Sequence, residues 1–506
     1  MLSFTILPLI SGIALWLAFP DHSLFFLSWV ALIPFLLFLT QQRSWKAIVA
    51  GNFVLGLTYF GGVLYWIPEV LTGYGGLGWR ISIPIFFLML LLLCLFFLPF
   101  SVLTHAVSTR SRAAALWSAP GFWVLSELLR NYYAVGGFPW ALLGYSQYPY
   151  EWMRQLADIS GVYLISFLIV FGNCALLALC RFRNYRTWVL PAIFALLFLG
   201  SNLYGWYRVE VWQVPAGKSI KAALVQPNIS LSAPLEHYAK KYFEVLPAYY
   251  RQAVSAGVAW VVFPEAPNPY FFDTDFYFRT FWQREVRNSG APLLLNSTSV
   301  ETGSAGTHYY NGALLIGPEE QPTYRYHKIH LVPFGEYVPA ADWLSFVQPL
   351  VQEVAGFSAG TTAVVGDVGG IPFGTLICFE GIFPESAREF VRQGAQLLVN
   401  ITNDAWYGRS AAPRQHLEFG AFRAVENRKP ILRCANSGYS AVIDPLGRIQ
   451  QELGLFQDGI VLADVTACPY RSIYSRVGEW LNISLVVLAL VTGVAVFRPR
   501  SKSRRK

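Results

Sequence analysis

Eight long apolar runs dominate this sequence. Seven of them fill the first 205 residues and the eighth stands near the C-terminus: 2–19, 24–40, 47–66, 81–104, 113–129, 157–180, 187–205 and 480–497. Each run approaches the ~20 residues that an α-helix needs to cross the hydrocarbon core of a bilayer. The first run has no basic segment before it and no small-residue cleavage site, so we interpret it as a retained helix and not as a signal peptide. The pattern predicts a polytopic α-helical membrane domain of about eight transmembrane helices.

The composition agrees with this interpretation. Of the 506 residues, 54% are hydrophobic and 13% are charged, whereas soluble proteins usually carry about 25% charged residues. An ordinary cytosolic enzyme and a disordered chain are therefore both excluded. Six cysteines are too few for a disulfide scaffold. We expect Cys94, Cys174 and Cys180 to be packing residues, and a disulfide between Cys434 and Cys468 remains an open alternative.

Basic residues in the short loops indicate the orientation of the chain. Thirteen of the 38 Lys and Arg residues fall in alternate loops and in the C-terminal tail, and the opposite loops hold only Arg80, Arg130 and Arg154. The thirteen are Arg43, Lys46, Arg110, Arg112, Arg181, Arg183, Arg186, Arg498, Arg500, Lys502, Arg504, Arg505 and Lys506. Because basic loops stay in the cytoplasm, both termini are predicted there and the segment 207–478 outside. The net charge of +8 then reflects membrane orientation and gives no support to nucleic-acid binding.

The predicted domains are 1–206 with seven transmembrane helices, 207–478 outside the cytoplasm, 479–497 as the eighth helix and 498–506 as a basic tail. The outer segment alternates strand-like and helical patterns, which predicts an α/β layered domain. The expected strands are 222–225, 260–263, 293–295, 313–316, 374–378, 397–401 and 440–443. The expected helices are 235–256, 276–288, 384–393 and 415–427.

Three stretches of the outer domain carry candidate chemistry. Glu265 stands between prolines just past an expected strand, Lys328 lies among aromatic residues and prolines, and Cys378 ends a buried strand before an expected helix. A cysteine near a helix N-terminus and a lysine is expected to have a lowered pKa. A thiol nucleophile needs a base and an oxyanion stabiliser, which Glu265 and Lys328 could supply. A solvated glutamate, a surface lysine and an inert buried cysteine are the alternatives.

A metal site is not predicted. His327 and His330 stand three residues apart, but no third ligand cluster or HExxH pattern accompanies them. No cofactor is expected either.

The ordered Glu265, Lys328 and Cys378 resemble the carbon–nitrogen hydrolase (nitrilase) superfamily. Longer strings resemble one of its families, the bacterial apolipoprotein N-acyltransferases, over nearly the whole chain. These strings are FPWALLGYSQ at 138–147, HLVPFGEYVP at 330–339, ICFEGIFP at 377–384, NITNDAWYG at 400–408 and PRQH at 413–416.

The resemblance implies a nitrilase-like αββα sandwich on the periplasmic face of the bacterial inner membrane. It implies transfer of an acyl chain from a phospholipid, such as phosphatidylethanolamine, to the α-amino group of the diacylglyceryl-cysteine of an apolipoprotein. Cys378 would form a thioester, Glu265 would be the general base and Lys328 would stabilise the oxyanion. Three further positions are implied to support the site or bind substrate: Glu336, Phe379 and Glu380. Phe379 stands where the family often has tyrosine.

Moving an acyl chain between two membrane-anchored substrates avoids exposing it to water, which costs about 0.8 kcal/mol per CH₂. An apolar opening towards the bilayer is therefore expected. The candidate lid is Trp343, Phe346 and Leu350, directly after Glu336, with a core segment as the alternative.

Other function classes remain open. A membrane-tethered amidase or nitrilase would use the same three residues but admit water to the thioester. A transporter with an extracytoplasmic regulatory domain is disfavoured, because the spans show no paired charges and no repeated halves, apart from the isolated Glu69 and Glu127 near helix ends. An inactive binding module is disfavoured because all three candidate residues are retained.

Overall fold

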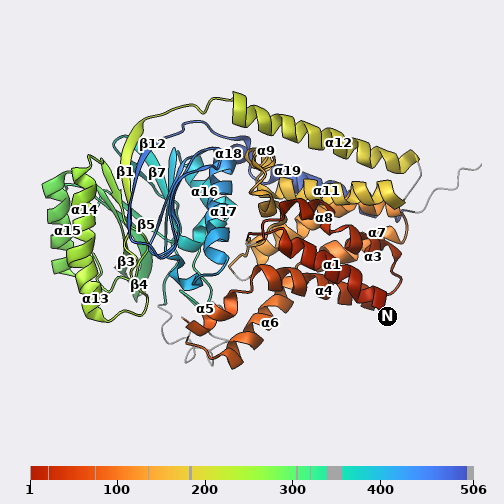
Figure 1. Cartoon of the computed structure of the whole chain (residues 1–506), viewed down its shortest axis with the longest axis horizontal. Coiled ribbons are helices and arrows are strands. Elements are labelled where there is room, and N and C mark those ends of the chain that lie inside the picture. The colour runs from red at the N-terminus through yellow and green to blue at the C-terminus, as the bar shows by residue number, and fades with distance from the viewer. Residues whose placement is uncertain are drawn as a thin grey trace, which may run out of the picture. The chain divides into compact units, whose positions relative to one another are not determined.

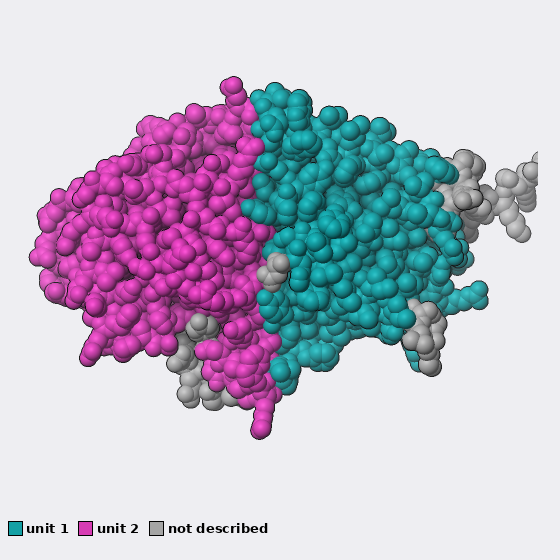
Figure 2. Space-filling view, in the orientation of Figure 1, with its two compact units in different colours: residues 1–65, 83–211, 477–506 teal, residues 66–82, 212–476 magenta. Residues whose placement is uncertain are grey.

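The structure, a computed structural model, describes residues 2–20, 22–73, 76–134, 136–181, 185–303, 306–319, 321–338 and 356–498 (Figure 1). The chain forms two compact units, coloured separately in Figure 2. Unit 1 is made of 1–65, 83–211 and 477–506, and unit 2 is made of 66–82 and 212–476. Hydropathy alone had assigned the segment 66–82 to the membrane domain, whereas it groups with unit 2.

All eight apolar runs form helices, some of them broken. The helices of this part of the chain are α1 (Leu2–Leu17), α2 (Ser28–Ala31), α3 (Ile33–Gln41), α4 (Trp45–Val63), α5 (Ile67–Gly73), α6 (Trp79–Leu95), α7 (Leu98–Ser108), α8 (Arg112–Tyr133), α9 (Glu151–Arg154), α10 (Ala157–Ser160), α11 (Val162–Arg181), α12 (Tyr185–Trp206) and α19 (Trp480–Ala495).

Four helical stretches within the described ranges are long and apolar enough to cross a membrane: Trp45–Val63, Trp79–Ser108, Val162–Arg181 and Trp188–Val211. Shorter apolar helices cover Thr5–Leu17, Phe25–Gln41 and Trp480–Ala495. The run 113–129 lies in α8, which belongs to neither group although it is 22 residues long. The count of eight transmembrane helices stays a prediction.

Helix α8 carries the polar interior of unit 1. Glu127 and Arg130 on this helix are buried, and both hold the chain segment that follows it. Glu127 Oε1 accepts a hydrogen bond from the Leu143 amide at 2.7 Å, and Arg130 donates to the Ala141 carbonyl at 2.9 Å. Irregular backbone within an apolar environment needs such partners, because neither lipid nor a helix supplies them.

The sequence-based expectation about these charges was therefore wrong in two respects. Arg130 lies inside a helix and not in an outer loop, and Glu127 is not isolated. An ion pair joins Asp158 to Arg208 at 2.8 Å. A hydropathy average over a window of sequence hides single charged residues, so it does not reveal which of them find partners in the folded chain.

Unit 2 contains two six-stranded sheets. The strands are β1 (Ser219–Gln226), β2 (Trp260–Val262), β3 (Leu293–Gly303), β4 (Gly306–Ile316), β5 (Tyr324–His327), β6 (Val365–Val368), β7 (Ile371–Ile377), β8 (Leu397–Thr402), β9 (Ile431–Ala435), β10 (Ser440–Ile443), β11 (Ile449–Leu453) and β12 (Gly459–Thr466). The sheet orders are β12-β1-β2-β3-β4-β5 and β11-β10-β9-β8-β7-β6. The neighbours β1, β2 and β3 are parallel in one sheet, and β7, β8 and β9 are parallel in the other.

Helices cover the outer faces of both sheets. They are α13 (Leu235–Lys240), α14 (Leu246–Ser255), α15 (Phe276–Ser289), α16 (Pro384–Arg392) and α17 (Ala412–Asn427), followed by the short α18 (Ile473–Val477). Figure 1 shows α14 and α15 beside one sheet and α16 and α17 beside the other. The inner faces pack through aromatic contacts such as Trp260 with Phe373, whose ring centroids are 4.9 Å apart. The predicted αββα sandwich is confirmed.

Every expected strand of the outer segment lies in a strand, although Phe263 and Cys378 fall just beyond strand ends. Five strands were not expected: β5, β6, β9, β11 and β12. Four of them are short or have exposed, polar positions, so their hydrophobic pattern is weak. Cys434 and Cys468 are both free, so the alternative of a disulfide between them is wrong.

Gly121 generates a prediction about unit 1, because α8 and α19 approach each other closely there. A Cβ atom at Gly121 would lie 2.5 Å from Ala489 Cβ and 2.9 Å from the Leu485 carbonyl oxygen. We expect Gly121→Val to destabilise the protein by roughly 1–3 kcal/mol, the usual cost of overpacking. A lowered apparent unfolding temperature of the detergent-purified protein would measure this. Gly200→Val in α12 is the control, since nothing lies within 4 Å of that position; an equal effect of both variants would contradict the prediction.

Candidate active site

The three candidate residues of the sequence analysis come together in unit 2. Glu265 follows β2, Lys328 follows β5 in the same sheet, and Cys378 follows β7 in the other sheet. Lys328 Nζ lies 3.7 Å from Glu265 Oε1, and both charged groups lie close enough to Cys378 to affect the pKa of its thiol. Strand ends at one edge of each sheet thus bring together residues that are far apart in the sequence.

Lys328 is almost completely buried, with 1% of its surface exposed. Its ammonium group lies 2.9 Å from Glu336 Oε2 and 3.0 Å from Glu336 Oε1. Burial alone would lower the pKa of Lys328, but Glu336 and Glu265 raise it well above the ordinary value. The lysine is therefore held as a cation beside the thiol.

Asn311 on β4 links the two carboxylates, and the sequence analysis did not identify it. Its Nδ2 donates to Glu265 Oε1 and to Glu336 Oε1, both at 2.8 Å. Its Oδ1 accepts from Asn296 Nδ2 at 2.8 Å, which fixes the orientation of the amide. An asparagine at the start of the buried half of β4 was the signal that could have revealed this role.

Burial and the neighbouring Glu336 raise the pKa of Glu265 above its ordinary value, against the opposing effect of Lys328. Burial, together with Glu265, also raises the pKa of the Cys378 thiol well above the ordinary value of 9.0. The expectation of a lowered thiol pKa was wrong, because 6% exposure leaves the thiolate almost without solvation. The resting group is a thiol, which needs a base before it can attack.

The backbone at Cys378 has an unusual conformation. The residue opens a short 3-10 helix, Cys378–Ile382, and its φ of +50° lies in the left-handed region. Such a φ is uncommon for a residue with a Cβ atom and is found where surrounding contacts impose it. The helix α16 begins only at Pro384, six residues after the cysteine.

Glu380 is completely buried and accepts hydrogen bonds on both oxygens. Oε1 accepts from the Tyr326 hydroxyl at 2.7 Å and from the amides of Ile329 and His330 at 2.7 and 3.1 Å. Oε2 accepts from the Ile377 amide at 2.8 Å. Glu380 therefore joins the backbone beside Lys328 to the backbone beside Cys378.

Phe379 is also buried, and its ring meets that of Phe383 edge-on at 5.2 Å. The candidate lid residues Trp343, Phe346 and Leu350 lie outside the described residues. His327 stacks on Tyr310 and His330 stacks on Phe383, each at 4.3 Å between ring centroids. Within the described part of the chain no group of three or more His, Cys, Asp or Glu could hold a metal ion.

The four donors around Glu380 generate a prediction. Glu380→Gln preserves the shape of the side chain but turns an NH₂ group toward N–H donors, so at least one buried hydrogen bond is lost. We expect this variant to lose roughly 1–3 kcal/mol of stability, measured as a lower apparent unfolding temperature. Glu389→Gln on the exposed face of α16 is the matched control, since its partner is a surface Arg392. Equal stability of both variants would count against this role.

Two family models match successive parts of the chain. The family model of the apolipoprotein N-acyltransferase N-terminal domain matches residues 11–175, and the carbon–nitrogen hydrolase model matches residues 221–472. A solved amidase from Nesterenkonia sp. is similar over 50% of this chain and 93% of its own, with 21% identity and a TM-score of 0.37.

Curated relatives match over nearly the full length. An apolipoprotein N-acyltransferase of Geobacter metallireducens is 37% identical, covering 98% of this chain and 96% of the relative. Those of Vibrio cholerae and Nitrosomonas europaea are 31% and 30% identical, covering 93% and 92% of this chain and 92% of each relative. The chain belongs to the apolipoprotein N-acyltransferase family, with a carbon–nitrogen hydrolase domain as its second half.

Proposed function

We propose that this protein transfers an acyl chain from a membrane phospholipid, of the phosphatidylethanolamine type, to the α-amino group of a diacylglyceryl-cysteine on an apolipoprotein. The observation that carries the proposal is the Lys328 ammonium 3.7 Å from the Glu265 carboxyl group, with both charged groups close to the buried thiol of Cys378. Membership of the family gives the class of donor and acceptor.

In the first half-reaction, Glu265 takes the thiol proton and the Cys378 sulfur attacks the ester carbonyl of the phospholipid. Negative charge develops on the carbonyl oxygen, where Lys328 stabilises it. The C–O bond to the glycerol then breaks, and Glu265 returns the proton to the departing alkoxide. The products are an acyl thioester on Cys378 and a lysophospholipid.

In the second half-reaction, the acceptor amine attacks the thioester carbonyl and loses a proton to Glu265. The C–S bond breaks, the thiolate recovers the proton, and an amide remains on the apolipoprotein. The same base thus serves both steps. Glu336 and Asn311 hold Lys328 and Glu265 in place, and Glu380 holds the two backbone segments that carry Lys328 and Cys378.

The location of the reaction follows from the apolar helices and the loop charges. We infer eight transmembrane helices, with both termini in the cytoplasm and unit 2 on the periplasmic side of the bacterial inner membrane. This arrangement is supported by the apolar runs and by the excess of Lys and Arg in alternate loops. An acyl chain exposed to water would cost about 0.8 kcal/mol per CH₂, so a membrane-embedded enzyme suits these substrates.

The thioester can be tested directly. After exposure of the purified protein to phospholipid vesicles, intact-mass and peptide mass spectrometry should find one acyl group on Cys378. Cys378→Ala should abolish the thioester adduct and all transfer, whereas Cys180→Ser, at an exposed cysteine of α11, should retain both. A diacylglyceryl-cysteine peptide should then discharge the thioester as an N-acyl peptide.

Two results would contradict the proposal. Without any acyl group on Cys378, the covalent mechanism fails. If the acyl group appears but leaves as free fatty acid in the presence of the peptide, the protein is a hydrolase of the nitrilase type and not a transferase.

The raised pKa of Glu265 predicts the pH dependence. A protonated carboxyl group cannot accept the thiol proton, so the rate of Cys378 acylation falls as the pH drops through the pKa of Glu265. Because that pKa is raised above 4.5, the midpoint of the acidic limb should lie above pH 4.5. Glu336→Gln removes one cause of the raised pKa of Glu265. The acidic limb of the pH–rate profile should therefore move to lower pH, while the maximal rate falls. An acidic limb that Glu336→Gln leaves in place would contradict this assignment; Glu389→Gln is the surface control.

A further inference from the structure

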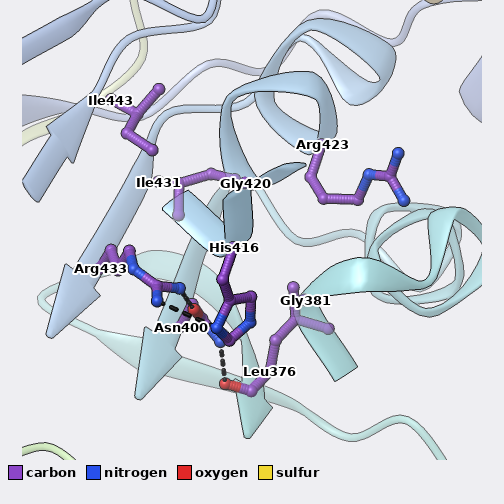
Figure 3. Close-up of a pocket in the computed structure, with 9 residues that line it drawn as sticks. All are labelled: Leu376, Gly381, Asn400, His416, Gly420, Arg423, Ile431, Arg433 and Ile443. Carbon is purple, nitrogen blue, oxygen red and sulfur yellow. Dashed lines mark hydrogen bonds between the residues drawn. The ribbon is translucent and has the colours of Figure 1, made fainter. Parts of the chain in front are cut away.

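A second buried network lies behind the nucleophile, and the reaction steps above do not use it. His416 on α17 is 1% exposed. Its Nε2 lies 3.2 Å from the carbonyl oxygen of Cys378, and its Nδ1 lies 3.0 Å from Asp404 Oδ1. Figure 3 shows His416 beside Arg433 and Asn400, with Leu376 at the end of the strand that leads to Cys378.

Asp404 and Arg433 fix the imidazole from its other side. Arg433 Nη2 lies 2.7 Å from Asp404 Oδ2 and 3.2 Å from His416 Nδ1. Burial would raise the pKa of Asp404, but Arg433 and His416 hold it below its ordinary range. Thr402 also donates to Asp404 Oδ1 at 3.1 Å. The carboxylate is therefore an ionised and immobile anchor.

These contacts determine which nitrogen of His416 carries a proton. A carbonyl oxygen can only accept, so Nε2 must be the donor toward Cys378. Nδ1 can then accept from Arg433 when the ring is neutral, or donate to Asp404 when it is charged. Burial and Arg433 lower the pKa of His416, against the opposing effects of Asp404 and of the Cys378 carbonyl. In either state the Nε2–H group points at the Cys378 carbonyl.

The bonded carbonyl belongs to the residue with the strained backbone. The φ of +50° at Cys378 is unfavourable for a residue with a Cβ atom, and the conformation therefore needs contacts that impose it. Asn400 Nδ2 reaches the same carbonyl only at 3.4 Å, since it bonds mainly to the Leu376 carbonyl at 3.0 Å. Of these two side chains, His416 makes the shorter contact with the Cys378 carbonyl oxygen, at 3.2 Å. The backbone direction at Cys378 decides where its thiol points relative to Glu265.

We propose that His416 is a positioning residue for Cys378: its Nε2–H group, oriented by Asp404 and Arg433, holds the Cys378 carbonyl and thereby keeps the thiol aimed at Glu265. The proposal rests on the proposed role of Cys378 as the nucleophile. A displacement of about 1 Å at a reacting group can cost 10²-fold in rate, so the effect belongs in the acylation step and not in substrate binding.

Two amide variants separate positioning from packing. His416→Gln places an amide N–H where Nε2 stood and can still reach the Cys378 carbonyl. His416→Asn keeps a donor near Nδ1 but is too short to reach that carbonyl. We expect His416→Gln to acylate Cys378 within about 3-fold of the wild-type rate and His416→Asn to fall by roughly 10- to 100-fold at unchanged KM. Single-turnover intact-mass measurements with phosphatidylethanolamine vesicles give these rates.

Alkylation of Cys378 by iodoacetamide is measured in parallel, because it reports thiol placement without any acyl donor. The same order, Gln above Asn, is expected there. If no acyl group forms on Cys378 in any variant but the alkylation order holds, the proposed function fails and the positioning role stands. Apparent unfolding temperatures are recorded for each variant. His416→Leu is a second variant without a donor, so the comparison does not depend on the folding of one protein, and His308→Asn controls for loss of an exposed histidine.

Two results would overturn the proposal. One is equal alkylation and acylation rates in the Gln, Asn and Leu variants. The other is a loss of rate that follows only the fraction of unfolded protein.

Discussion

A lysine ammonium that is almost completely withdrawn from water cannot remain charged without anionic partners. An unpaired buried ion costs several kcal/mol, and Lys328 meets this constraint through Glu336 at 2.9 Å and Glu265 at 3.7 Å. Two carboxylates so close would repel each other, and Asn311 donates to both. The cation beside the nucleophile therefore requires a whole set of fixed groups, drawn from β4 and the loops that follow β2 and β5.

The same burial governs the chemistry. It keeps Cys378 in the thiol form and raises the pKa of Glu265, so that proton transfer from sulfur to carboxylate occurs between groups whose charged forms are both poorly solvated. Reduced access of water would also protect a thioester from hydrolysis. A transferase and a hydrolase with the same three residues differ in this respect.

Much of the fold could be predicted from the sequence, and particular residues show where prediction stopped. The apolar runs identified helices. Glu265 and Cys378 were found at the ends of expected strands, and Lys328 was found among aromatic residues and prolines. Asn311 was missed because one polar residue beside an apolar run has many explanations. The predicted direction of the shift in the pKa of the Cys378 thiol was wrong, because a sequence does not reveal how deeply a cysteine is buried. Glu127 and Arg130 gained partners only through the loop that folds back onto α8.

The segment 66–82 shows another limit. It lies between two apolar runs, so hydropathy assigns it to the membrane part, yet it belongs to unit 2. There Trp66 meets Tyr407 at 5.1 Å between ring centroids, and Tyr407 meets His416 at 6.2 Å. Aromatic contacts of this kind depend on tertiary structure and leave no periodic pattern in the sequence.

Glu380 has a consequence for how the sandwich tolerates change. It ties the chain beside β5, in one sheet, to the end of β7, in the other. The separation between cation and sulfur is therefore coupled to the spacing of the two sheets, which the core between them sets. Trp260 and Phe373 take no part in the reaction, but their rings pack between the two sheets and help to set the distance between them. Substitutions in that core have to conserve combined volume, because a thicker or thinner filling would change activity even where the fold survives.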